Sequence, residues 1–400
     1  MFKNIFLVLL LVFLGFSQLN AQTEVDERAM INFRKGLGFN APDSSFGINL
    51  RVRMQNRVAL NLNENLGIND IEARVSRLRL RFDGYILDQK ITYYIQLSFS
   101  RGDQDWDNTY MANVVRDAMV YYRFNPNFYV GFGQGKLPGN RQRIISSGQQ
   151  QFFDRSNVNA NYTLDRDFGL FGYYSNNVGP LFYNLKAAVS TGDGRNQIRT
   201  NNGLMYTGRV ELLPLGKFTN DSDFSEGDLE HESTPKLSLA TGYATNQKAM
   251  RTRGTTGSSL FESRNMNSFF ADVLLKYQGW AFSSEYINRT TDASAITYNP
   301  VDSLKISAVN IGEGINTQLS YYFKKSHWEI AARYSVVVPG EEIRSYNMKD
   351  TYYLLGINKY VKKHLTKFQL FTGFRSQQSY TSHTFGSDQF LLVFQVELGI

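Results

Sequence analysis

The chain has 400 residues and no cysteine, and its 43 lysines and arginines against 36 aspartates and glutamates give a formal net charge of +7. A chain without cysteine forms no disulfides, which excludes the small secreted domains that depend on them. No segment after the N-terminus approaches 18 consecutive apolar residues, which excludes a transmembrane helix. The length fits two or three ordinary domains or one large barrel.

The N-terminus has the pattern of a secretory signal peptide. Lys3 supplies a positive charge, residues 5–16 form an apolar core, and Ala21 precedes a suitable cleavage point. The apolar run is too short to cross a bilayer as a helix. We therefore expect residues 1–21 to be a cleaved signal peptide, residues 22–45 a short periplasmic segment, and residues 46–400 the folded part.

The segment "VSRLRLRFDG" at residues 75–84 alternates strictly between two kinds of side chain. Leu78, Leu80 and Phe82 occupy the even positions, and Arg77, Arg79 and Arg81 occupy the odd ones. A helix would spread these arginines around its circumference, whereas a strand sorts them onto one face. Such a strand fits a soluble sheet with a basic outer face as well as a membrane barrel, so the rest of the chain must decide.

The same alternation continues to the C-terminus, in about sixteen segments of roughly 10 to 15 residues, which is typical of a transmembrane barrel. Clear examples are residues 48–55, 91–99, 181–190, 328–335 and 390–398. A barrel of this size leaves an aqueous lumen, which the polar face of each strand would line.

The connections between these segments alternate in length. Short turns are predicted at 87–90, 125–127, 176–179, 278–279, 324–327 and 362–364. Longer polar loops are predicted at 61–70, 102–113, 192–202, 247–266, 290–312, 339–349 and 377–387. This rhythm is expected when one rim of a barrel is periplasmic and the other external. The acidic segment 216–234 falls where a short turn is expected, and nothing in the sequence explains its length.

Aromatic residues of the apolar face gather beside the short turns, where a membrane barrel carries an interfacial girdle. They are Tyr122, Phe124, Phe128, Tyr277, Trp280, Phe323 and Trp328. A soluble sandwich has no reason to place them at one height. The three patterns together predict an all-β fold, a transmembrane antiparallel β-barrel of about sixteen strands in the outer membrane.

Several motifs recur in an order and spacing that resemble one family of outer-membrane channels. They are "SRLRLRFDG" (76–84), "GQGKLP" (133–138), "FFDRS" (152–156), "RDFGL" (166–170), "STGDGRN" (190–196), "GRVELLPLG" (208–216) and "EYINR" (285–289). The chain resembles the phosphate-selective porin O and P family. The resemblance implies a sixteen-stranded, usually trimeric barrel whose third external loop folds into the lumen, at residues 137–160. Departures from the family pattern occur at Asp154, at residues 139–143 and at the terminal Ile400.

Ten basic residues are the candidate pore-lining, anion-attracting groups: Arg51, Arg53, Arg57, Arg77, Arg79, Arg81, Lys136, Arg141, Arg143 and Arg155. A basic wall and a basic loop would attract anions into the lumen. The alternative is that these arginines pair with acids opposite and only keep the channel wet. The predicted function is passive diffusion of small solutes through an anion-preferring porin, with phosphate among the candidate solutes.

Other functions find less support in the sequence. Of the four histidines, only His383 lies on the external side, and it has no convincing serine or aspartate partner for catalysis. The glycines of "GFGQG" at 131–135 precede Pro138 rather than a helix, and no cluster has metal-ligand spacing. We therefore expect no enzyme activity, no cofactor and no nucleic-acid partner. The expected partners are outer-membrane lipid, small anions such as phosphate, and further copies of the chain in a homotrimer.

Two alternatives remain open at this point. An adhesive or structural barrel would act through its external loops and could have a plugged lumen. A sugar or oligosaccharide channel would carry an aromatic track inside, which inward Tyr94 and Tyr121 would permit.

Overall fold

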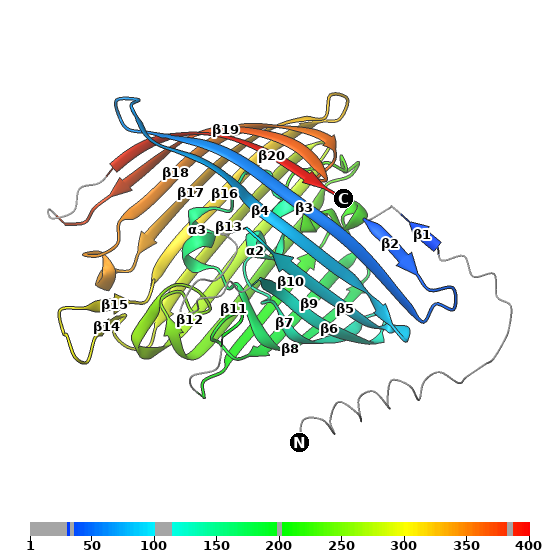
Figure 1. Ribbon diagram of the computed structural model, residues 1–400, viewed down its shortest axis with the longest axis horizontal. Helices are drawn as coiled ribbons and strands as arrows, with labels where there is room; N and C mark the ends of the chain where they lie inside the picture. Colours follow the sequence, from blue (N-terminus) through cyan, green and yellow to red (C-terminus); the bar gives the residue numbers. More distant parts are fainter. Residues whose placement is uncertain (1–29, 33–35, 101–113, 198–201, 382–386) are drawn as a thin grey trace, which may run out of the picture.

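The computed structural model describes residues 30–32, 36–100, 114–197, 202–381 and 387–400 (Figure 1). The predicted signal peptide at 1–21 and the predicted loop at 102–113 lie outside the described residues. Within the described residues, no helix is long and apolar enough to span a bilayer.

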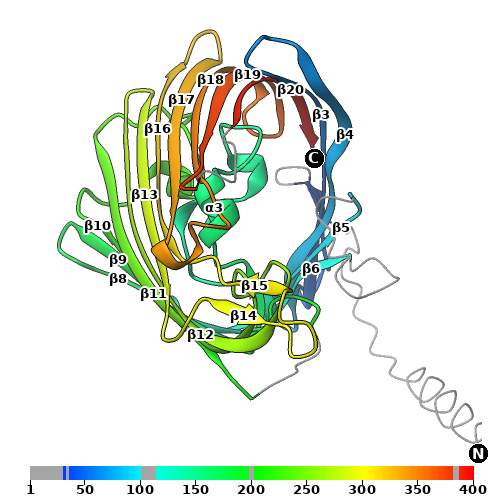
Figure 2. The same cartoon turned by 90° about the vertical axis from the view of Figure 1, so that its left-hand side faces the viewer.

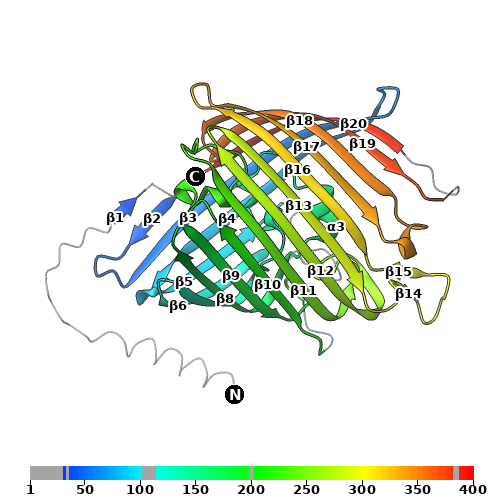
Figure 3. The ribbon, with the colours of Figure 1, turned by 180° about the vertical axis from the view of Figure 1, so that it is seen from behind.

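Sixteen strands of the described chain form one closed antiparallel barrel, as predicted. Each pairs with its neighbour in the chain, and the last pairs with the first, from Phe390 opposite Leu62 to Gly399 opposite Arg53. Closure pairs the backbone groups that an open sheet would expose to lipid. The strands run obliquely around the barrel (Figures 1 and 3). They are β3 (Phe46–Leu62), β4 (Ile68–Ile86), β5 (Asp88–Ser98), β6 (Val115–Asn125), β7 (Phe128–Lys136), β8 (Arg166–Val178), β9 (Leu181–Ser190), β10 (Met205–Leu213), β11 (Lys236–Arg251), β12 (Ser259–Tyr277), β13 (Trp280–Thr291), β16 (Gly312–Phe323), β17 (Trp328–Pro339), β18 (Lys349–Lys362), β19 (Thr366–Gln378) and β20 (Ser387–Gly399).

The remaining elements are short. β1 (Met30–Asn32) pairs with β2 (Leu37–Asn40), and β2 extends the sheet by pairing with the first residues of β3. β14 (Ile296–Tyr298) and β15 (Ile306–Ala308) form a hairpin in the connection after β13. The helical turns are α2 (Arg141–Ile144), η2 (Ser147–Gln149), α3 (Asn157–Tyr162), η3 (Thr219–Phe224) and η4 (Glu341–Ile343).

The alternation in the sequence becomes an apolar outside and a polar inside. Outward side chains such as Val120, Phe132 and Leu170 are more than half exposed, whereas inward Gln55 and Gln395 are each 1% exposed. This is the reverse of a soluble protein and is what a lipid-facing barrel requires. The predicted girdle aromatics are also outward, with Tyr122, Phe124, Tyr277, Trp280, Phe323 and Trp328 all exposed.

Short turns and longer loops alternate around the barrel, which defines a turn-side mouth and a loop-side mouth. The short turns are residues 87, 126–127, 179–180, 278–279, 324–327 and 363–365. Two predicted loops are wrong in length, because β3 and β4 leave 63–67 between them rather than 61–70, and β11 and β12 leave 252–258 rather than 247–266. At these ends of β3, β4, β11 and β12 the apolar alternation stops, but the strands continue to pair by backbone hydrogen bonds. A strand that extends above the membrane meets water on both faces.

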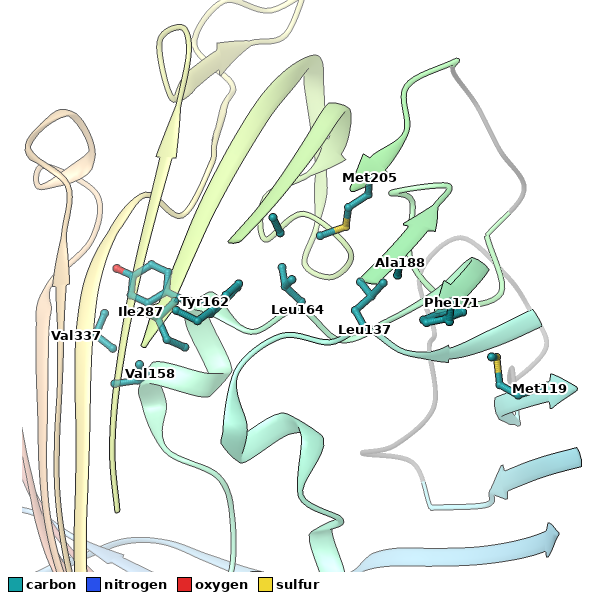
Figure 4. Close-up of a cluster of buried hydrophobic side chains, with 12 residues drawn as sticks. Met119, Leu137, Val158, Tyr162, Leu164, Phe171, Ala188, Met205, Ile287 and Val337 are labelled. Atoms are coloured by element: carbon teal, nitrogen blue, oxygen red, sulfur yellow. The ribbon is translucent and has the colours of Figure 1, made fainter. Parts of the chain in front are cut away.

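Residues 137–165, which we call the inward loop, leave β7 and fold into the space enclosed by the strands before β8 begins (Figure 2). An apolar cluster holds the loop against the wall (Figure 4). Val158 and Tyr162 of the loop pack with Ile287 of β13 and Val337 of β17, and Leu137 belongs to the same buried cluster. Val158 and Tyr162 therefore hold α3 of the loop on the β13 and β17 side of the lumen.

Candidate functional site

Arginines oppose one another across β3 and β4 inside the lumen. The register pairs Arg51 with Arg81, Arg53 with Arg79, and Gln55 with Arg77. Residues two apart on a strand are about 6.8 Å apart and point to the same face. The five arginines of this set, which we call the arginine row, thus form a double line of positive charge. Like charges directly opposite destabilise a sheet unless other groups compensate them.

At the turn-side end of the row, one carboxylate serves two arginines. Asp83 Oδ1 lies 2.8 Å from Arg81 Nε, and its Oδ2 lies 3.4 Å from Arg51 Nη2. The Arg81 guanidinium also lies 4.5 Å from the centre of the Tyr94 ring. The side chains of Arg51 and Arg81 are 29% and 33% exposed, so water and ions in the lumen can reach both.

Further along the wall, the basic residues hold the inward loop. Arg57 Nη1 and Arg77 Nη2 lie 3.0 and 2.5 Å from the carboxylate of Asp154. Arg79 donates to Ser147 Oγ at 2.7 Å, and Arg53 donates to Ser146 Oγ at 3.1 Å.

Asp154 is the acid at the centre of these contacts. Burial raises the pKa of Asp154, but the charges of Arg77 and Arg57 lower it by more, so the net shift of the pKa is downward. The carboxylate is therefore ionised at neutral pH. It neutralises part of the charge of two predicted pore arginines.

Two basic residues of the inward-loop region bind its own carbonyl groups. Lys136 Nζ donates to Ile144 O at 2.9 Å, and Arg155 donates to Gln142 O and Ile145 O at 2.8 and 2.9 Å. Burial, followed by the charges of Arg77 and Arg79, lowers the pKa of Arg155 to about 9, which leaves it a cation at pH 7. Arg155 forms no ion pair within the described part of the chain.

Arg141 and Arg143 point to different partners. Arg143 pairs with Asp165 at the end of the inward loop. Arg141 reaches the opposite wall, where its Nε lies 2.5 Å from Asp272 Oδ1 on β12. The other carboxylate oxygen of Asp272 lies 2.7 Å from Arg209 of β10. Arg141 is thus an anchor between the loop and the wall, away from the arginine row.

A polar cavity of about 570 Å³ lies between the inward loop and the walls. Among the described residues, its charged lining consists of eight arginines and three aspartates: Arg77, Arg79, Arg116, Arg143, Arg155, Arg195, Arg333, Arg375, Asp154, Asp165 and Asp350. The formal excess is five positive charges. We call this space the arginine cavity.

The structure brings only part of the predicted set to this cavity. Arg77, Arg79, Arg143 and Arg155 line it, whereas Arg51, Arg53, Arg57, Arg81, Lys136 and Arg141 do not. The predicted set of ten did not include Arg116, Arg195, Arg333 and Arg375. The inward parity of Arg333 on β17 and Arg375 on β19 was available in the sequence, but the position of Arg195 depends on how its loop folds.

Arg333 is the clearest addition to the predicted set. It donates to Asp154 O at 2.8 Å and to Gln318 Oε1 at 3.1 Å, and its guanidinium lies 3.9 Å from the centre of the Phe152 ring. Like Arg155, it forms hydrogen bonds but no ion pair among the described residues. These hydrogen-bond partners are neutral oxygens, whereas Arg77 and Arg143 each bind a carboxylate. No group of three potential metal-ligating side chains occurs in the described ranges.

Comparison with known proteins gives one family and a set of similar folds. The family model described as "Phosphate-selective porin O and P" matches residues 48–385. No curated protein sequence matches the chain.

The solved structures with a similar fold include the following three outer-membrane proteins. The anion-selective porin of Comamonas acidovorans is 12% identical, with a TM-score of 0.53, over 89% of this chain and 100% of that one. The channel DcaP of Acinetobacter baumannii is 12% identical, with a TM-score of 0.54, over 93% and 100%. The outer-membrane protein OmpT of Vibrio cholerae, in its trimer form, is 10% identical, with a TM-score of 0.54, over 89% and 100%.

Proposed function

The chain belongs to the phosphate-selective porin O and P family and forms an outer-membrane porin channel, and we propose that this channel prefers anions to cations. The family and the fold indicate a channel rather than an enzyme. The observation that carries the proposal is the arginine cavity, with its formal excess of five positive charges.

Electrostatic magnitudes support this preference. A unit charge 4 Å from a passing ion contributes about 1 kcal/mol in bulk water and more where the dielectric falls. A bias of about 1.4 kcal/mol already favours one sign of ion tenfold. Neighbouring arginines of the row are about 6.8 Å apart, which is less than the Debye length of about 8 Å at physiological ionic strength. An anion would therefore stay within reach of the next cation as it moves along the row.

Phosphate and similar oxyanions are the proposed solutes. Guanidinium groups bind phosphate oxygens in a planar, two-point geometry that a chloride ion cannot use. Arg155 and Arg333 would be the first candidates, because both line the cavity and neither has a described carboxylate partner. Phosphate should then bind in the channel while it permeates.

Ion flux through the purified protein in a planar bilayer tests both statements. Under a potassium chloride gradient, the reversal potential should have the sign of an anion-selective channel. Adding phosphate should reduce the chloride current in a saturable way. A reversal potential of the opposite sign would contradict the anion preference, and a chloride current that phosphate leaves unchanged would contradict phosphate binding.

A group of inward aromatic residues is the main evidence for a sugar channel, and it is weaker than the evidence that the arginines give for an anion channel. Tyr121, Tyr129 and Tyr173 form a cluster on the inner wall, with Tyr129 and Tyr173 stacked at 4.5 Å between ring centres. Because these two rings cover each other's faces, they do not offer a continuous track for sugar rings. We therefore keep the anion channel as the proposed function.

Export and assembly complete the proposal. Residues 1–21 would be removed as a signal peptide, residues 22–45 would lie at the periplasmic side, and three copies would associate in the outer membrane. The reported trimer form of the similar OmpT fold supports a homotrimer. N-terminal sequencing of the mature protein and its native mass in mild detergent would test the two statements separately.

A further inference from the structure

The connection between β10 and β11, residues 214–235, differs from every other described connection at the turn-side mouth. The other six are no longer than residues 324–327. This segment, which we call the acidic turn, contains Asp221, Asp223, Glu226, Asp228, Glu230 and Glu232. Excess acidic residues in a turn are normally solvated, yet Glu226, Asp228 and Glu232 are each less than 5% exposed.

Hydrogen bonds within and below the acidic turn explain how its acids can be buried. The Glu232 carboxylate accepts from Thr219 N at 2.8 Å and from Ser222 Oγ at 3.1 Å. Lys276 Nζ of β12 donates to Ser222 O at 2.6 Å and to Ser225 O at 3.0 Å. Buried polar groups persist only when such partners satisfy them. The segment therefore has a defined fold inside the mouth.

The acidic turn extends along the wall from β9 to the turn after β18. Lys217 lies 4.1 Å from the centre of the Phe182 ring on β9, and Asp228 accepts from Gly279 N at 2.8 Å. Leu229 packs with Tyr322 of β16 and Tyr360 of β18. Beyond them, Glu230 pairs with Lys363 at 2.6 Å. These contacts fix the segment across one half of the mouth.

The acidic turn also meets the inward loop within the lumen. Glu226 N donates to Gln149 O at 2.8 Å, and Glu226 Oε2 accepts from Gln151 N at 2.8 Å. The next residue, Gly227, has a φ of +74°, and a Cβ added there would lie 2.4 Å from Glu329 Oε1. Only glycine permits this close approach to the wall without strain.

The space that remains between the two segments is too small for a solute. The cavity lined by Gln142 and Gln151 of the inward loop, by Glu226 and Gly227 of the acidic turn, and by residues of β12, β13 and β16 has a volume of about 20 Å³. One water molecule needs about 10 to 15 Å³ on this scale. The arginine cavity on the other side of the inward loop is larger by more than an order of magnitude, at about 570 Å³.

We propose that the acidic turn is a second constriction element, which enters from the turn-side mouth, holds the inward loop through Glu226, and together with that loop closes the half of the lumen between β9 and β18. Solutes are thereby directed along the arginine row of β3 and β4. The field of the row is screened over about 8 Å at physiological ionic strength, so ions that pass close to the row feel it most. The segment therefore acts as a specificity-determining element of the channel. The expected change in the anion-to-cation permeability ratio rests on the proposed anion preference, whereas the expected change in conductance does not.

Replacing residues 217–233 with a short glycine-serine turn tests the proposal in planar bilayers. Conductance should rise, because the space that the acidic turn fills becomes available to ions. The anion-to-cation permeability ratio should fall at the same time. A replacement variant that inserts and keeps both the wild-type conductance and the wild-type reversal potential would overturn the proposal.

Point variants keep the proposal testable even where the replacement variant does not insert. Glu226→Ala removes the acceptor for Gln151 N, so the conductance should rise and the single-channel current should become noisier. Glu226→Gln keeps an acceptor oxygen and should restore the wild-type current. The matched control is Glu230→Ala, since Glu230 lies in the same segment but bonds to Lys363 and Asn220 rather than to the inward loop.

The outcomes separate this proposal from the anion preference. If the replacement variant conducts more than the wild type, the constriction is supported. If the wild type is at the same time not anion-selective, the anion preference is contradicted. If the single-channel current of Glu226→Ala is the same as that of the wild type and of Glu230→Ala, the constriction is contradicted.

Discussion

At the scale of single residues, inward-facing arginines have two different roles. Arg57 and Arg77 bind Asp154 and hold the inward loop, whereas Arg155 and Arg333 line the arginine cavity without a described carboxylate partner. A charge that is already paired contributes less to the potential in the lumen than one whose partners are neutral carbonyl groups. The selectivity of the channel should therefore depend most on the second kind.

Changing Arg155→Gln should reduce the anion-to-cation permeability ratio about fivefold, because one charge near the ion path contributes about 1 kcal/mol. Glutamine can still donate to one of the carbonyl groups that Arg155 binds, which limits the effect on the loop. The reversal potential under a salt gradient measures the ratio. Arg344→Gln is the control, since Arg344 lies in the connection between β17 and β18 at the loop-side mouth and pairs with Glu341. Equal effects of the two variants would contradict a special role for Arg155.

Changing Asp154→Asn should lower the free energy of unfolding by about 1 to 2 kcal/mol. This value lies between those of buried and of exposed charged hydrogen bonds, because the Asp154 side chain is 38% exposed. The variant loses the charge that Arg57 and Arg77 bind, so the lumen also becomes more positive. Urea unfolding in lipid vesicles measures the first effect, and the reversal potential should shift further towards anions. A variant as stable as the wild type would show that Asp154 does not hold the loop.

The pH dependence of this difference follows from the lowered pKa of Asp154. Burial raises the pKa, but Arg77 and Arg57 lower it more, so the folded-state pKa is below the unfolded value of about 3.9. The stabilisation is then fully present above that unfolded value and is lost as the pH falls through the folded-state pKa. The stability difference between wild type and Asp154→Asn should stay constant from about pH 5 to 8 and disappear in stronger acid. A difference that changes between pH 5 and 8 would contradict this assignment.

At the scale of elements, the two faces of a strand must remain on opposite sides of the wall. Leu80 of β4 points outward between inward Arg79 and Arg81. Changing Leu80→Arg should destabilise the barrel by about 2 to 4 kcal/mol if the residue lies near the middle of the bilayer. Denaturant titration of the inserted protein measures the change, with Leu80→Met as the apolar control. Equal stability of both variants would mean that Leu80 does not face lipid.

The strands could be predicted from the sequence because a period of two is a local property of the chain. The alternation in residues 75–84 predicts β4, and the turns at 126–127 and 278–279 were predicted to within a residue or two. The ends of β11 and β12 could not be predicted, because above the membrane both faces of a strand meet water and the apolar alternation stops. The hydrogen-bonded ladder continues there without that signal.

The site was less predictable, because it depends on contacts between distant parts of the chain. Whether Arg57 lines a cavity or binds a loop depends on Asp154, which is far from it in sequence. The place of the acidic turn depends on Lys276, Gly279 and Lys363, which belong to three different elements. Inward parity restricts the candidates, but the fold of the inserted segments decides among them.

At the scale of the whole molecule, the topology predicts which connections are external. Protease added to intact cells should cut within residues 252–258 or 292–311, which lie at the loop-side mouth. Residues 324–327 lie at the opposite mouth and should be protected until the membrane is permeabilised. Mass spectrometry of the fragments identifies the cut sites. Cleavage at 324–327 in intact cells would show that the barrel has the opposite orientation.

The arginine row lies beside the seam where the first and last strands meet, which has a consequence for the order of folding. Gln55 Nε2 bonds to Glu397 Oε2 at 2.9 Å, and Arg53 Nε lies 3.1 Å from Glu397 Oε1. Contacts between such distant residues carry a high entropic cost and tend to form late. We therefore expect the conducting wall to be among the last parts of the molecule to assemble in the membrane. Conductance should then appear only after most of the strand structure has formed, and simultaneous recordings of current and circular dichroism during insertion would reveal that delay.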